Sequence, residues 1–130
     1  MDRLLSRPER GSASTEAVLL TPVLLFVVML VIQFGLWYHA QHVVQAAARE
    51  GVRAARMEAS SAVAGRTRAA EFLAGAGPTI VRQPVVTASR DAERAVVSVS
   101  GRAVNVVPGF ELPVGATATS QVERFRGDVG

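Results

Sequence analysis

One uninterrupted apolar stretch limits what this chain can fold into: AVLLTPVLLFVVMLVIQFGLWY, from Ala17 to Tyr38, carries no formal charge. As an α-helix it would be roughly 33 Å long, which is about the hydrocarbon thickness of a bilayer. A domain made from the remaining residues is too small to surround a helix that is apolar on every side. A cleaved secretory signal has a shorter apolar core. We therefore predict a transmembrane helix, with Trp37 and Tyr38 at a membrane–water interface.

The flanking charges predict the orientation of this helix. Three arginines lie in the short segment before it, Arg3, Arg7 and Arg10. Basic residues close to a membrane span favour the cytoplasmic side. The arginines beyond the span lie further out and are partly balanced by Glu50 and Glu58. We expect the N-terminus inside the cell and the C-terminal part exported across the membrane.

Composition argues against several classes of function. The net charge is +3, there is no cysteine, and the arginines are spread singly among acidic residues. A nucleic-acid partner is not expected, since such proteins more often show a dense basic stripe with stacking aromatics. His39 and His42 lack a third ligand nearby, so no metal is expected. The sequence contains no phosphate loop, nucleophile elbow or spaced carboxylate pair, so we expect no cofactor and no enzyme activity.

A carboxylate stands at the start of the apolar stretch, in RGSASTEAVLL. Placing the Glu16 charge near a bilayer costs free energy, although less at a helix end than at its centre. One explanation is local: Ser14 or Thr15 caps the helix, and Glu16 favours its positive N-terminal end. The other explanation is that Glu16 pairs with a cation. The residues alone do not decide between them.

The same segment resembles the type III signal of type IV pilin-like proteins, because Gly11 follows Arg10 and Glu16 is the fifth residue after that glycine. The resemblance implies that a prepilin peptidase cuts between Gly11 and Ser12 on the cytoplasmic side. The cut would create an α-amino group that is largely cationic at neutral pH. Glu16 could then pair with this amine within one subunit or between neighbouring subunits in a filament.

A second resemblance is narrower. The stretch from Gln33 to Arg56, QFGLWYHAQHVVQAAAREGVRAAR, is similar to TadE-like proteins, the minor pseudopilins of tight-adherence pili. The strongest pieces are QFG at 33–35 and AAREGVRAA at 47–55. The resemblance covers about residues 10–58, and this chain has Gln33 where the family pattern has glutamate. It implies a structural or assembly component without an active site.

The helix is expected to continue past Tyr38 with one face of small residues, namely Ala40, Val44, Ala47, Gly51 and Ala54. Such a face allows close packing, either against the protein's own sheet or against another subunit. The segment from Ala59 to Ala74 is also compatible with helix. Gly65 is expected to mark a bend or a break, and Gly75, Gly77 and Pro78 to end it.

After Pro78 the sequence becomes rich in valine and threonine, with alternation typical of strands. RDAER at 90–94 predicts a hairpin turn and PGFELPVG at 108–115 a longer connection, while Pro84 weakens the first strand or places it at an edge. The predicted fold class is α+β: a long N-terminal helix packed on a small antiparallel sheet of about three strands, as in type IV pilins. The predicted regions are a leader (1–11), a transmembrane helix (12–38), an exported helical region (39–77), a sheet region (78–126) and a tail (127–130).

These observations predict a TadE-like minor pilin or pseudopilin that assembles or initiates a tight-adherence pilus. Its expected partners are the prepilin peptidase, other pilin subunits, the inner-membrane assembly platform and membrane lipid. The main alternative is an uncleaved single-pass membrane protein whose exported module binds a partner outside the cytoplasm. A weaker alternative is the anchored accessory subunit of an enzyme.

Overall fold

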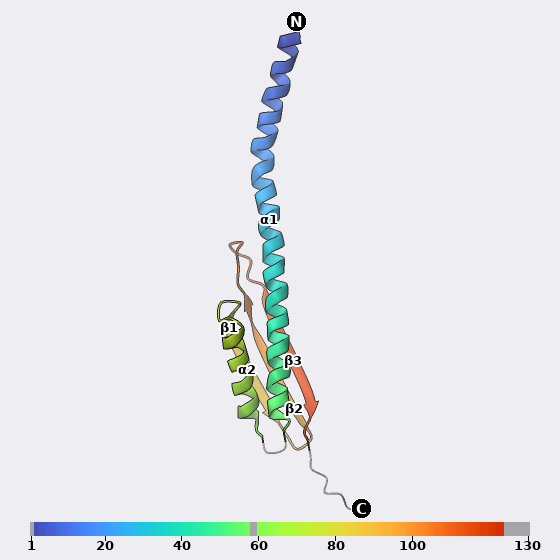
Figure 1. The fold of residues 1–130 in the computed structure, drawn as a ribbon, viewed down its shortest axis with the longest axis vertical. Helices are drawn as coiled ribbons and strands as arrows, with labels where there is room; N and C mark the ends of the chain where they lie inside the picture. Colours follow the sequence, from blue (N-terminus) through green and yellow to red (C-terminus); the bar gives the residue numbers. More distant parts are fainter. Residues whose placement is uncertain (1, 58–59, 124–130) are drawn as a thin grey trace, which may run out of the picture.

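The computed structural model describes residues 2–57 and 60–123, with side chains from residue 13 onwards. The described elements are α1 (Asp2–Ala55), α2 (Ala62–Ala76), β1 (Val81–Arg90), β2 (Arg94–Ala103) and β3 (Pro113–Gln121). Figure 1 shows α1 as one long rod, with the other elements gathered around its C-terminal half. The predicted α+β, pilin-like arrangement is confirmed. The predicted tail at 127–130 lies outside the described residues.

The two halves of α1 have opposite environments. From Ala13 to Val28 every residue is exposed, and most large apolar side chains between Val18 and Ile32 are 47–70% exposed. The helix is long and apolar enough to cross a membrane, and only 6% of an 18-residue apolar stretch within it is buried. The other described elements therefore do not cover this half, as they would cover the core helix of a globular protein. From Ala40 onwards, by contrast, α1 contributes much of the hydrophobic core.

The sheet is antiparallel, with strand order β1-β2-β3. The predicted turn between β1 and β2 is formed by Asp91, whose Oδ1 accepts hydrogen bonds from the backbone N–H groups of Glu93 and Arg94, both at 2.7 Å. An aspartate that bonds to the backbone two and three residues ahead is a common turn former. Pro84 does lie on an edge strand, and the register of β1 shifts between Arg82 and Val85. A proline at an edge costs no hydrogen bond between strands.

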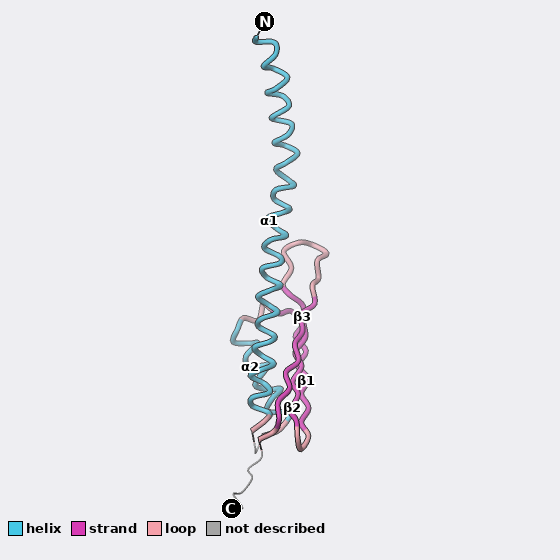
Figure 2. Tube along the Cα trace, turned by 90° about the vertical axis from the view of Figure 1, so that its right-hand side faces the viewer, coloured by secondary structure: helices cyan, strands magenta, loops and turns pink. Residues whose placement is uncertain are grey.

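Both helices lie on the same face of the sheet (Figure 2). The α2 helix starts at the N-cap Ser61, whose Oγ accepts from the Ala64 N–H at 3.2 Å, and ends at Gly77, whose φ is 121°. Val97 and Val99 of the central strand point into the layer between helices and sheet and are almost fully buried. The core is built mainly from alanine and valine, so the layers approach one another closely.

Gly65 does not bend or break α2, contrary to the expectation from the sequence. It lies inside the helix, where it is buried against Gly51 of α1. A Cβ atom at Gly65 would lie 2.7 Å from the Cβ of Ala55 and 2.9 Å from the backbone oxygen of Gly51. The glycine is therefore needed for the close approach of two helices, rather than for a change of direction.

Candidate functional site

The predicted processing segment lies within α1. Gly11 and Ser12 are helical, and Glu16 is exposed one turn after Ser12. Among the residues whose side chains are described, none forms a hydrogen bond or an ion pair with Glu16. Because α1 begins at Asp2, Ser14 and Thr15 are inside the helix and neither is its N-cap. The capping explanation for Glu16 therefore fails for the uncut chain.

The face of small residues on α1 is directed into the protein's own module. Ala40, Val44, Ala47 and Gly51 are buried, and Ala54 is partly buried. The first three belong to the hydrophobic core, and Gly51 meets α2 and Val97. In the folded chain this face packs against α2 and the sheet, which leaves its buried members inaccessible to another subunit.

Three side chains of α1, spaced one helical turn apart, bond to the backbone of β3 and of the β2–β3 connection: Gln33, Trp37 and Gln41. This role was not predicted from the sequence. The indole Nε1 of Trp37 donates to the backbone oxygen of Pro113 at 3.1 Å. The amide of Gln41 donates to the Gly115 oxygen at 2.7 Å and accepts from the Gly115 N–H at 3.2 Å. Trp37, which the sequence predicts at a membrane interface, is also partly buried against the core cluster.

Gln33 is the buried member of this set, with 1% of its surface exposed. Its Nε2 donates to the Val104 oxygen at 3.2 Å, and its Oε1 accepts from the N–H groups of Val106 at 2.8 Å and Val107 at 3.2 Å. These bonds hold the connection between β2 and β3 against α1 (Figure 1). A glutamate here could accept both amide bonds, but a carboxylate could not donate to Val104. The amide therefore makes one more bond than the charged residue of the family pattern.

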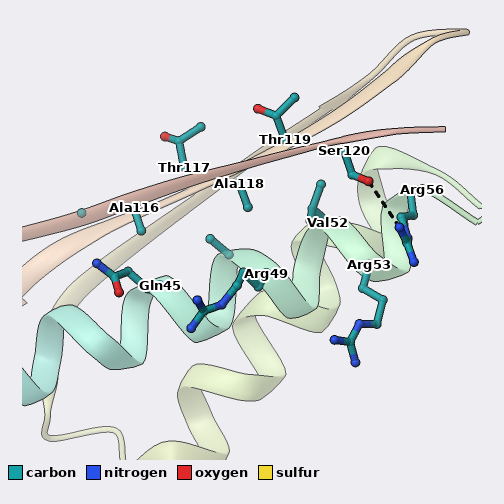
Figure 3. A pocket seen from close by; sticks show the side chains of 12 residues that line it. Gln45, Arg49, Val52, Arg53, Arg56, Ala116, Thr117, Ala118, Thr119 and Ser120 are labelled. Carbon is teal, nitrogen blue, oxygen red and sulfur yellow. Dashed lines mark hydrogen bonds between the residues drawn. The ribbon is translucent and has the colours of Figure 1, made fainter.

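A groove of about 680 Å³ lies between the last turns of α1 and strand β3 (Figure 3). It is lined by Arg49 and Arg53 of α1 and by Arg56, which directly follows α1, together with Gln45, Ala48, Val52 and the residues from Gly115 to Ser120. Arg53 pairs with Glu50 at 3.3 Å, and Arg56 pairs with Glu123 at 3.7 Å. Glu50 also pairs with Arg68 of α2 at 3.6 Å. The pairing of Arg53 with Glu50 joins two side chains three residues apart on the exposed side of α1.

The two histidines lie apart from this groove. His39 and His42 are exposed, and the ring of His42 meets the edge of Tyr38 at 4.5 Å between centroids. Within residues 2–57 and 60–123, no three His, Cys, Asp or Glu residues are grouped so that they could hold a metal ion. His42 thus has an aromatic neighbour near the point where α1 meets the module.

A helix long enough to cross a membrane, followed by a second helix and a three-stranded antiparallel sheet, is a pilin-like arrangement. The family model described as TadE-like protein matches residues 11–53 of this chain. The match confirms the resemblance to TadE-like proteins of tight-adherence pili. Searches of curated proteins and of solved structures gave no match to the chain.

Proposed function

We propose that this chain is a minor pilin or pseudopilin that acts in the assembly or initiation of a tight-adherence pilus. The observation that carries the proposal is the TadE-like match, which starts at Gly11 and runs through the exposed apolar half of α1 into the folded module. In this role the apolar half anchors the protein in the membrane, with its N-terminus inside the cell, and packs against other pilin helices. The role is structural, and we propose no catalytic activity.

Processing by a prepilin peptidase after Gly11 is part of this proposal. The cut leaves Ser12 as the first residue and places its cationic amine one helical turn from Glu16. Glu16 is exposed on a helix that the rest of the chain does not cover, which leaves it accessible to a neighbouring helix. Its carboxylate then pairs with the new amine of a neighbouring subunit or with that of its own chain. Either pair offsets part of the cost of holding a charge at the membrane.

The groove beside β3 favours a second candidate function. An uncleaved single-pass protein could use an exported module of this shape to bind a partner, and two arginines of the groove, Arg49 and Arg53, are exposed to solvent. This function needs neither the cut after Gly11 nor Glu16. Substitution of Glu16 therefore separates the two candidates.

We expect Glu16→Ala to reduce the amount of assembled pilus at least about tenfold, the effect of losing about 1.4 kcal/mol of pairing free energy. The protein should still insert into the membrane at normal levels, because the substitution makes α1 more apolar. The measurement is the sheared pilus fraction of cells that lack the wild-type gene and express each variant. Glu71→Ala removes an exposed glutamate of α2 and is the matched control. Wild-type pilus output from Glu16→Ala would contradict the proposed pairing.

A further inference from the structure

Strand β3 lies at an edge of the sheet, and its outer backbone groups are only partly used. In an antiparallel pair, alternate residues direct both backbone groups towards the partner strand or away from it. Gly115 directs its N–H and its oxygen to the side chain of Gln41, and hence away from β2. The same orientation recurs at Thr117 and Thr119, which follow at intervals of two in an unbroken register.

Side chains of α1 form hydrogen bonds with the outward backbone groups in only the first half of β3. The backbone groups of Pro113 and Gly115 bond to Trp37 and Gln41. In the described part of the chain, the outward N–H and oxygen of Thr117 and Thr119 have no partner. The opposite edge of the sheet is different, because β1 contains Pro84 beside a register shift. Proline and irregular register are features that prevent an edge from pairing with another strand.

The unsatisfied half of β3 borders the arginine groove. All three arginines line the groove; in Figure 3 the strand runs above α1, with Arg49 on the helix below it, Arg56 next to Ser120, and Arg53 extending from the side of α1 away from the strand. Arg49 makes no ion pair within the described residues, while Arg53 shares Glu50 with Arg68. Arg49 and Arg53 are four residues apart on a helix, or about 6 Å along its axis. Alternate residues of a β-strand are separated by about 6.8 Å, which is close to this spacing.

We propose that this edge binds an extended acidic segment of another protein, which adds as a fourth strand beside β3. Backbone hydrogen bonds to Thr117 and Thr119 supply affinity, as in other cases of strand addition. Carboxylates on alternate residues of the segment meet Arg49 and Arg53 on the side of the sheet that faces α1, and its other side chains lie on the opposite side, beside Thr117 and Thr119. The other sheet edge of this chain is the proline-containing β1, with a basic residue near each end, so a second copy is a poor occupant. The proposal does not depend on cleavage after Gly11.

Peptide binding to the full chain in detergent micelles tests this proposal. The probe is a fluorescein-labelled peptide of alternating threonine and glutamate, equal in length to the 9 residues of β3. We expect saturable binding with a dissociation constant below about 100 µM, and binding at least about tenfold weaker when lysine replaces glutamate. N-methylation of the alternate amides that face β3 should abolish binding, while methylation of the other alternate set should not.

Variants of the protein locate the site. Arg49→Gln combined with Arg53→Gln should weaken binding at least about tenfold, whereas Arg66→Gln on α2 should leave it unchanged. Thr119→Pro removes an N–H that β2 does not use, so the sheet should persist while binding is lost. Thr119→Val retains that N–H and should bind like the wild type. Trp37 fluorescence verifies that each variant keeps the sheet docked on α1.

Three results would overturn the proposal. The acidic and the lysine peptides could bind equally, or neither could bind. The full chain could also associate with itself in sedimentation experiments and lose this association on Thr119→Pro, in which case a second copy would be the occupant.

Discussion

Replacement of Gly65 by alanine is expected to lower the free energy of unfolding of the module by about 2 kcal/mol, although alanine is the better helix former. The added methyl would lie 2.7 Å from the Cβ of Ala55 and 2.9 Å from the backbone oxygen of Gly51. Neither atom is the end of a flexible side chain, so α1 and α2 must move apart. Val97 lies at the same crossing and would lose part of its packing.

A second glycine of the same helix provides the control. No atom lies within 4 Å of the position that a Cβ would occupy at Gly75. Gly75→Ala should therefore raise the free energy of unfolding by about 0.4–1 kcal/mol, through the lower entropy of the unfolded chain. Both variants can be followed in detergent micelles by the fluorescence of Trp37, the single tryptophan, during denaturant unfolding. Stabilisation by both alanines would show that the two helices do not cross at Gly51 and Gly65.

Gln33→Leu is expected to release the connection between β2 and β3 and to destabilise the module by about 3 kcal/mol. Leucine fills a similar volume but leaves the N–H groups of Val106 and Val107 and the oxygen of Val104 without their partner. The bond to the Val107 N–H is buried and the other two are partly buried, and a buried backbone group that loses its hydrogen bond costs about 1–3 kcal/mol. Amide hydrogen exchange at Val106 and Val107 should become markedly faster, which identifies where the loss occurs.

Gln41→Leu is the matched control for this variant. Gln41 also bonds to the backbone at two points, but its bonds to Gly115 are exposed, so water can replace them. The expected loss is below about 1 kcal/mol, within the usual net value of one hydrogen bond. Equal losses for the two variants would contradict the claim that the burial of Gln33 makes its bonds critical.

Hydrophobic patterns along the sequence were enough to predict most of the fold. The uninterrupted apolar run predicts a helix because of its length, and the valine and threonine alternation after Pro78 predicts strands because of its period of two. The aspartate in RDAER predicts its turn for a similar reason, since the bonds it makes are local. These features need no knowledge of which elements meet in space.

Other features depend on contacts between elements that are far apart in the sequence. Gly65 suggests a helix break when read alone, which is wrong, and only the crossing with Gly51 explains it. Trp37 suggests a membrane interface when read with its apolar run, and its hydrogen bond to the oxygen of Pro113, 76 residues away, could not be predicted from that run. Polar residues at intervals of four, Gln33, Trp37 and Gln41, were the available signal that one side of the helix docks on other elements. The unpaired backbone groups of Thr117 and Thr119 could not be predicted, because the strand register decides which backbone groups point outwards.

The mass of the mature N-terminus tests the central claim most directly. Intact-mass and N-terminal peptide measurements would be made on the protein from membrane and pilus fractions, in cells with and without an active prepilin peptidase. The account predicts a chain that begins at Ser12 when the peptidase is active and one that retains residues 1–11 when it is absent. A chain that begins at Met1 in both kinds of cell would contradict it.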